Sequence, residues 1–163
     1  MSTLEVKAIQ APSGFDLDMP AGHIVQVVSA TYSTLVSMSS TTHVDTGLTA
    51  TITPKFASSK ILVQVHQNGI QTHNNQANND VTILLYRGST QIAKPAAFVG
   101  FTNSTTFTYS STVSGSYLDS PSTTSATTYK TTFANPDAGG AGGTVYVQSG
   151  TPDSTLTLIE VAQ

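Results

Sequence analysis

The residues Asp45, Thr46 and Gly47 form the tripeptide that aspartic proteases carry at each of their two catalytic aspartates. In such enzymes the two carboxylates share one proton and activate a water molecule. That site needs an apolar strand before the tripeptide, a small residue after it and a second copy of the loop. Here the polar segment 40–44 precedes the tripeptide and Leu48 follows it. The sequence therefore predicts a turn, in which Asp45 accepts a backbone hydrogen bond and Gly47 takes a positive φ, and no catalysis.

Other residue types with catalytic or metal-binding chemistry are too sparse to form a site. The four histidines (His23, His43, His66 and His73) show neither the HxH nor the HxxxH spacing of metal ligands. The glycine-rich segment 139–143 lacks the lysine and serine or threonine of a phosphate-binding loop. We expect no enzyme activity, no metal and no cofactor.

The amide-rich segment 72–80 is the strongest candidate for contact with a ligand. Side chains of Asn and Gln offer both hydrogen-bond donors and acceptors, which suits the hydroxyl groups of a sugar. The candidate glycan-contact residues are Asn74, Asn75, Gln76, Asn78 and Asn79. The alternative is a solvated loop tip with no ligand.

The composition indicates which elements must position these residues. The chain has 27 threonines and 20 serines among 163 residues, and only 9% of its residues are charged. Threonine favours strands, and strong helix formers are scarce, so an all-β fold is predicted. A net charge of −3 without a basic stripe argues against nucleic-acid binding, and cysteine is absent. We expect neither a secretory signal nor a membrane-spanning segment, because no apolar run has the required length.

The alternation of apolar and polar residues predicts eight or nine strands from His23 onward. The clearest candidates are residues 23–35, 48–54, 60–66, 81–88, 126–133, 144–148 and 155–162. In the segment 60–66, Ile61, Val63 and Val65 face one way, and Leu62, Gln64 and His66 face the other. Segments 37–47 and 67–80 are predicted to be polar loops. Many short strands between turn signals are typical of an antiparallel jelly-roll sandwich.

The N-terminal segment is predicted to be a short arm. Residues 2–9 alternate, with Leu4, Val6 and Ala8 on one side and Ile9 at the end, and residues 10–22 contain two prolines and two glycines. We therefore expect an arm and linker over residues 1–22 and a jelly-roll domain over residues 23–163. The arm would attach to a capsid; alternatively, it pairs at an edge of its own domain.

The last predicted strand is apolar on both faces. Leu156 and Leu158 lie on one face, and Ile159 and Val161 lie on the other. A sandwich strand that faces solvent is polar on one side, so this strand is buried twice. Since no helix is predicted to cover the sheet, the four residues are assigned to an interface with other copies of the chain.

Five ordered blocks resemble a domain of tailed-bacteriophage virion proteins. The blocks are MPAGHIVQVV, DTGLTATITPKFASSKILVQV, LLYRGSTQIA, SYLDSPSTTSATTYKTTF and STLTLIEVA, and they span residues ~19–162. The domain occurs in phages of cyanobacteria and marine bacteria, in many of them at the C-terminus of a tail fibre. The resemblance implies a homotrimeric jelly roll similar in shape to tumour-necrosis-factor-like domains, with the last strand near the threefold axis. It implies no catalytic residues.

Two functions fit this resemblance. The first is a trimeric decoration (cement) protein on the surface of the phage head, bound to the major capsid protein or another virion protein. The second is a tail-fibre or spike tip that binds a host-surface glycan. A fibre normally has a long shaft before this domain, whereas only ~22 residues precede it here, which favours the head. In either case the protein would be made in the host cytoplasm and would lie on the virion surface.

Overall fold

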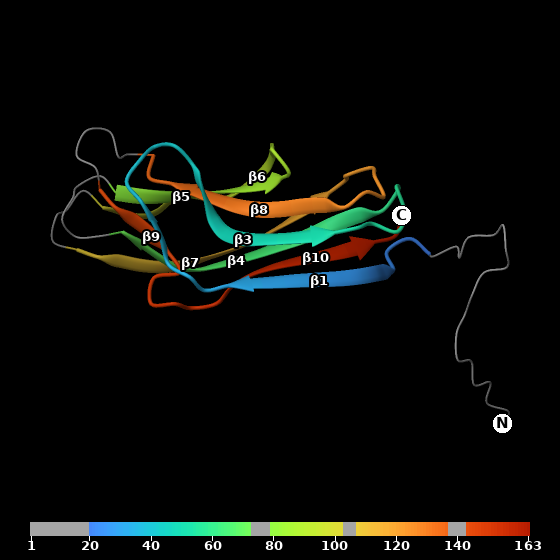
Figure 1. Cartoon of the computed structure of the whole chain (residues 1–163), viewed down its shortest axis with the longest axis horizontal. Helices are drawn as coiled ribbons and strands as arrows, with labels where there is room; N and C mark the ends of the chain where they lie inside the picture. The colour runs from blue at the N-terminus through green and yellow to red at the C-terminus, as the bar shows by residue number, and fades with distance from the viewer. Residues whose placement is uncertain (1–19, 73–78, 103–106, 137–142) are drawn as a thin grey trace, which may run out of the picture.

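Two antiparallel β-sheets form the body of the protein. The computed structural model describes residues 20–72, 79–102, 107–136 and 143–163, which contain ten strands and no helix (Figure 1). The first sheet contains β1 (Ile24–Tyr32), β2 (Val36–Met38), β4 (Lys60–Thr72), β7 (Tyr109–Asp119), β9 (Val145–Val147) and β10 (Ser154–Val161). The second contains β3 (Val44–Ile52), β5 (Asn79–Arg87), β6 (Thr90–Thr102) and β8 (Thr127–Ala134).

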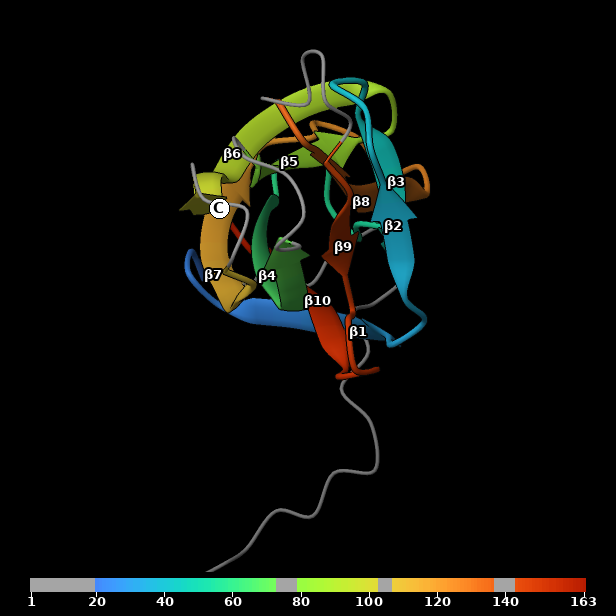
Figure 2. The same ribbon diagram turned by 90° about the vertical axis from the view of Figure 1, so that its left-hand side faces the viewer.

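The strand order is that of a jelly roll. The order β1-β10-β4-β7 in the first sheet faces the order β3-β8-β5-β6 in the second. The short strands β9 and β2 extend the first sheet beyond β4 on the side of β10. Figure 2 shows the two sheets as the walls of a sandwich. The prediction of an all-β jelly-roll sandwich is confirmed, whereas the trimer stays a prediction.

Period-two alternation explains the core. One apolar cluster includes Ile61, Val63 and Val65 of β4 together with Leu156 and Leu158 of β10. A second cluster lies nearer the opposite end of the sandwich and is centred on β5, β8 and β9. Between the sheets, several buried polar groups hydrogen-bond to one another, because an unpaired buried hydroxyl or amide is costly. The Thr131 hydroxyl donates to Gln67 Oε1 (3.1 Å), and Gln67 Nε2 donates to Ser154 Oγ (3.0 Å).

Both predicted polar loops contain strand residues. Segment 37–47 includes most of β2 and the start of β3, and segment 67–80 includes the end of β4 and the start of β5. The amide-rich end of β4 is still a strand because it pairs with β7 as far as Thr72. The end of β4 and the start of β5, before and after residues 73–78, therefore pair with neighbouring strands despite their polar composition.

Asp45 lies in a bulged strand and not in a turn. The register between β3 and β8 shifts between Asp45 and Thr49, and Gly47 has a φ of +86°. The positive φ at Gly47 was predicted. The hydroxyl of Thr46, rather than the carboxylate of Asp45, accepts the N–H of Leu48 (3.1 Å).

A buried glutamate anchors the end of the sandwich where β10 finishes. The Glu160 carboxylate accepts hydrogen bonds from Gln26 Nε2 (2.6 Å) and from the backbone N–H groups of Lys55 (2.8 Å) and Phe56 (3.2 Å). Burial alone would raise the pKa of Glu160, but these donors outweigh it and hold the pKa below its ordinary value. At the same end Gly22 donates its N–H to the carbonyl of Ala162, so residue 22 and the C-terminus lie together.

Candidate assembly surface

The two faces of β10 have different environments. Leu156 and Leu158 are completely buried between the sheets of a single copy of the chain. Ile159 and Val161 point away from that core and are half-buried. All four residues were predicted to form an interface between copies. The structure assigns the inner pair to the protein's own core, so only the outer pair is available to another molecule.

Strand pairing places further aliphatic residues beside this outer pair. Ile159 lies opposite Val27 of β1 and Leu62 of β4, and Leu62 lies opposite Leu118 of β7. Val161 lies opposite Ile24. Directly opposed residues of antiparallel strands share a face. These six side chains (Ile24, Val27, Leu62, Leu118, Ile159 and Val161) are named the apolar patch, and it spans four strands.

The apolar patch is well exposed for an aliphatic surface. Ile24, Val27 and Leu118 have exposed fractions of 61%, 56% and 50%. Isolated exposed aliphatic residues are normal, whereas a contiguous group across a sheet marks a surface that binds another molecule. This patch is therefore the strongest candidate assembly surface in the described part of the chain.

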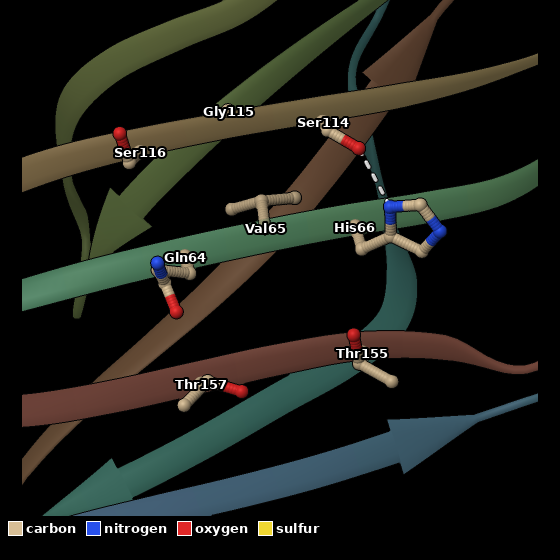
Figure 3. Close-up of a pocket in the computed structure, with 8 residues that line it drawn as sticks. All are labelled: Gln64, Val65, His66, Ser114, Gly115, Ser116, Thr155 and Thr157. Atoms are coloured by element: carbon tan, nitrogen blue, oxygen red, sulfur yellow. Dashed lines mark hydrogen bonds between the residues drawn. The ribbon is translucent and has the colours of Figure 1, made fainter.

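The same sheet face becomes polar farther from the chain termini. The next two rows across the strands carry hydroxyl, amide and imidazole groups, with Ser29, Thr157, Gln64 and Ser116 in one row and Thr31, Thr155, His66 and Ser114 in the other. Figure 3 shows the residues of β7, β4 and β10 that line an open pocket here. The pocket has a volume of about 420 Å³. The pocket is a shallow, uncharged, hydrogen-bonding surface continuous with the apolar patch.

One contact in this pocket has the form of a nucleophile and its base. His66 Nδ1 lies 2.6 Å from Ser114 Oγ, as the dashed line in Figure 3 marks. A catalytic pair of this type also needs a group that orients the imidazole and donors for an oxyanion. Among the described residues, no carboxylate is hydrogen-bonded to His66. The pair therefore resembles the other cross-strand hydrogen bonds on this face, such as Ser29 Oγ to Thr157 Oγ1 at 3.1 Å.

The candidate protease residue does not sit in a catalytic arrangement. Asp45 is exposed, and its carboxylate pairs with Lys130 Nζ at 2.8 Å, where an aspartic protease has a second carboxylate. Within the described ranges no three histidine, cysteine, aspartate or glutamate side chains are grouped to hold a metal ion. No helix in that part of the chain is long and apolar enough to span a membrane.

The other predicted contact residues divide between described and undescribed segments. The arm residues Leu4, Val6, Ala8 and Ile9 and the loop residues Asn74, Asn75, Gln76 and Asn78 lie outside the described residues. Asn79 is described, but it lies on β5 with an exposed fraction of 1% and accepts a hydrogen bond from Asn135 Nδ2 (2.9 Å). A side chain buried in this way cannot contact a glycan, so the prediction was wrong for Asn79.

Four members of the apolar patch were not predicted as interface residues. The alternation in β4 did place Leu62 on the face opposite to Ile61 and Val63. The sequence did not predict the strand order. Only the order β1-β10-β4-β7 brings these four residues together.

Comparisons with known proteins identify a fold. No protein-family model matches the sequence, and no curated protein sequence matches it. The chain is similar to infectious bursal disease virus VP2 in the crystal structure of a subviral particle, with a TM-score of 0.53 and 11% identity over 96% of this chain. Structures of the Gt and Gx strains of that virus give TM-scores of 0.49 and 0.44, at 14% and 13% identity over 97% and 95% of this chain. The chain covers 37%, 43% and 42% of these three proteins, so it spans less than half their length. The likeness to VP2 shows a shared jelly-roll architecture and nothing finer.

Proposed function

We propose that the protein is a non-enzymatic structural component of a virion, and specifically a homotrimeric decoration protein on the head of a tailed bacteriophage. The observation that carries the proposal is the apolar patch, which lies on a sheet face that no other part of the described chain covers. The resemblance to phage virion domains and the jelly-roll likeness to a protein of a viral particle both support it. The protein would reach the virion surface after synthesis in the host cytoplasm.

Self-association is the use that best fits the apolar patch. The patch crosses the four neighbouring strands β1, β10, β4 and β7 near the chain termini, with Lys60 as the charged residue next to Val161 in the same row. Threefold association would bring three copies of β10 together, and the polar rows with Ser29, Thr157 and Gln64 would continue the contact with hydrogen bonds. Interfaces of this kind combine an aliphatic centre with a polar, hydrated rim.

The solution mass of the protein tests the trimer. Light scattering at micromolar concentration should give close to three times the chain mass of 17.0 kDa. A stable monomer at that concentration would exclude the trimer and would leave the patch for a different virion protein. Counting the copies in purified virions then tests the location, since hundreds indicate the head and a dozen or two indicate a fibre.

The N-terminal arm is proposed to attach the trimer to the major capsid protein or another shell protein. An extended segment can add a strand to a neighbour's sheet, which satisfies its backbone groups and buries its apolar side. Three arms per trimer would act together and raise the avidity. Deletion of residues 1–20 should leave a soluble trimer with unchanged melting that no longer binds heads lacking the protein. Full binding by the truncated trimer would place the attachment surface on the jelly roll.

A tail-fibre or spike tip is the second candidate. The specific observation in its favour is the set of exposed aromatic side chains at the end of the sandwich opposite the chain termini. The copy number distinguishes this candidate from a head protein.

A further inference from the structure

Four large aromatic side chains are exposed where β6 ends and β7 begins. Phe98, Phe101, Phe107 and Tyr109 have exposed fractions of 67%, 47%, 60% and 49%. Tyr109 pairs with Thr72 at the end of β4, far from the chain termini. The ends of β6 and β7 are in contact, because a Cβ placed on Gly100 would lie only 3.3 Å from Tyr109 Cβ. Figure 2 shows β6 and β7 at the same side of this end. The four side chains are named the aromatic corner.

Two β-bulges in β6 lie beside Phe98 and Phe101, whose rings face solvent. Ile83 of β5 pairs with Ala96 and Val81 pairs with Val99, so β6 uses three residues where β5 uses two. The same excess recurs between Val99 and Thr102. Ala96 and Val99 both pack against the second core cluster. In a regular strand Phe98 would face the same side as Ala96, so the first bulge exposes a phenylalanine that regular alternation would bury.

The backbone at Phe98 is held in an unfavourable conformation. Its φ is +57°, which is a genuine outlier for a bulky side chain without the freedom of glycine. Such outliers persist where the surrounding structure enforces them, and they concentrate at binding sites. At this position the strained conformation presents a phenylalanine and not a glycine or asparagine, which would fit it without strain.

The strand segments that carry the aromatic corner are uncharged and rich in hydrogen-bonding groups. Residues 95–102 and 107–118 contain no charged side chain. Gln71 Nε2 donates to Ser110 Oγ at 3.2 Å on the adjoining strands, and further hydroxyls follow along β7. The flat negative face of an aromatic ring attracts the polarised C–H groups of a sugar, and hydroxyls and amides bind its O–H groups.

We propose that the aromatic corner is a binding site for a neutral carbohydrate. The inference names a ligand class and a site for the glycan-binding role of the second candidate function and rests on that role, whereas the copy number per virion tests the head or tail location separately. A membrane surface is a poorer match, since interfacial segments carry lysine or arginine beside their aromatic residues. A charged glycan is also a poorer match, because residues 95–102 and 107–118, which carry the corner, offer no counter-charge.

Electrophoresis through native gels that contain polysaccharide tests the site. The probes are dextran, mannan and galactan as neutral polymers and alginate as a charged polymer. We expect at least one neutral polymer to retard the full-length protein and alginate not to do so. Phe101→Ser and Phe107→Ser should each weaken the retardation at least tenfold. Leu35→Ser is the matched control, because Leu35 is also exposed (46%) but lies between β1 and β2.

A second variant separates binding from folding. Phe98→Gly relieves the positive φ, so it should melt no lower than the wild-type protein while losing retardation. Absence of retardation in all three neutral gels overturns the proposal. It is also overturned if Leu35→Ser weakens the retardation as much as Phe101→Ser and Phe107→Ser do. Sedimentation of the protein with phosphatidylcholine vesicles, abolished by Phe101→Ser, would assign the corner to a lipid surface and would equally overturn it.

Discussion

The inner and outer faces of β10 both carry aliphatic side chains but differ in burial. Its inner face carries Leu156, Leu158 and Glu160, all fully buried within one copy. Its outer face carries Ile159 and Val161, which are equally aliphatic but half-exposed. The inner residues complete their contacts when the chain folds, whereas the outer residues can do so only when another molecule arrives. On the proposed function, similar side chains in one strand thus stabilise different equilibria, namely folding and association.

The largest expected effect is loss of an inner leucine. Leu158→Ala should lower the free energy of unfolding by about 2–5 kcal/mol, because it removes buried methyl groups and leaves a cavity between the sheets. Ile159→Ala is the matched change on the outer face and should cost less than about 1 kcal/mol in a single copy. Urea denaturation measures both, at a protein concentration low enough for light scattering to show single copies of the chain. Equal losses would show that the two faces are not distinct.

Glu160 tests the polar end of the inner face. Glu160→Gln should cost about 1–3 kcal/mol at neutral pH, because the donors from Gln26, Lys55 and Phe56 then meet a weaker acceptor. The pKa of Glu160 is lower in the folded state, so its charge stabilises the fold above the pKa of an unfolded glutamate. That contribution disappears as the pH falls from about 4.3 through the folded-state pKa.

The pH dependence can be measured by denaturation at several acidic pH values. The wild-type protein should lose stability more steeply with falling pH than Glu160→Gln, which lacks this titrating group. Parallel curves for the two proteins would contradict a lowered pKa at Glu160.

These two faces also show what could be predicted from the sequence. Alternation alone places Leu158 and Ile159 on opposite sides, because the period of a strand is two. Alternation also places Leu62 and Ile61 on opposite faces of β4. It cannot reveal that Leu62 and Leu118 are neighbours, since that requires the pairing of β4 with β7 over a long separation in the chain.

Bulges limit the sequence-based prediction in a second way. Asp45 and Phe98 each lie beside a register shift, where one extra residue changes the side to which the next side chains point. The carboxylate of Glu160, within an aliphatic strand, is buried because backbone donors of the β3–β4 connection reach it. Donors of this kind come from residues remote in sequence, so the local alternation of apolar and polar residues cannot predict them.

The outer face is tested by association and not by folding. Ile159→Asp should leave the single copy folded, while a desolvated charge at the centre of the apolar patch weakens association by about 2 kcal/mol or more. That energy corresponds to roughly a 30-fold higher dissociation constant. Light scattering across a dilution series measures it. Thr51→Asp adds the same charge to an exposed position on β3 in the other sheet and should leave the mass unchanged.

The smallest expected effect is that of Asp45→Asn in the bulge of β3, where the same contrast recurs between adjacent residues. Thr46 is fully buried, and its Oγ1 lies 2.6 Å from Thr131 Oγ1, so Thr46→Val should cost about 1–3 kcal/mol. Asp45 is exposed and paired with Lys130, and exposed ion pairs contribute at most about 1 kcal/mol. Asp45→Asn should therefore change the free energy of unfolding by less than about 0.5 kcal/mol and leave the oligomeric mass unchanged.

The same variant examines the protease signature directly. An assay with a denatured protein substrate at acidic pH should detect no cleavage by the wild-type protein or by Asp45→Asn. Cleavage by the wild-type protein that Asp45→Asn abolishes would mean that Asp45 performs chemistry. The Asp45 carboxylate would then need a second carboxylate from another copy to share its proton. The ion pair between Asp45 and Lys130 would also have to break. An unchanged melting curve and an absence of cleavage together would assign Asp45 to the solvent side of the bulge, where it pairs with the Lys130 amine.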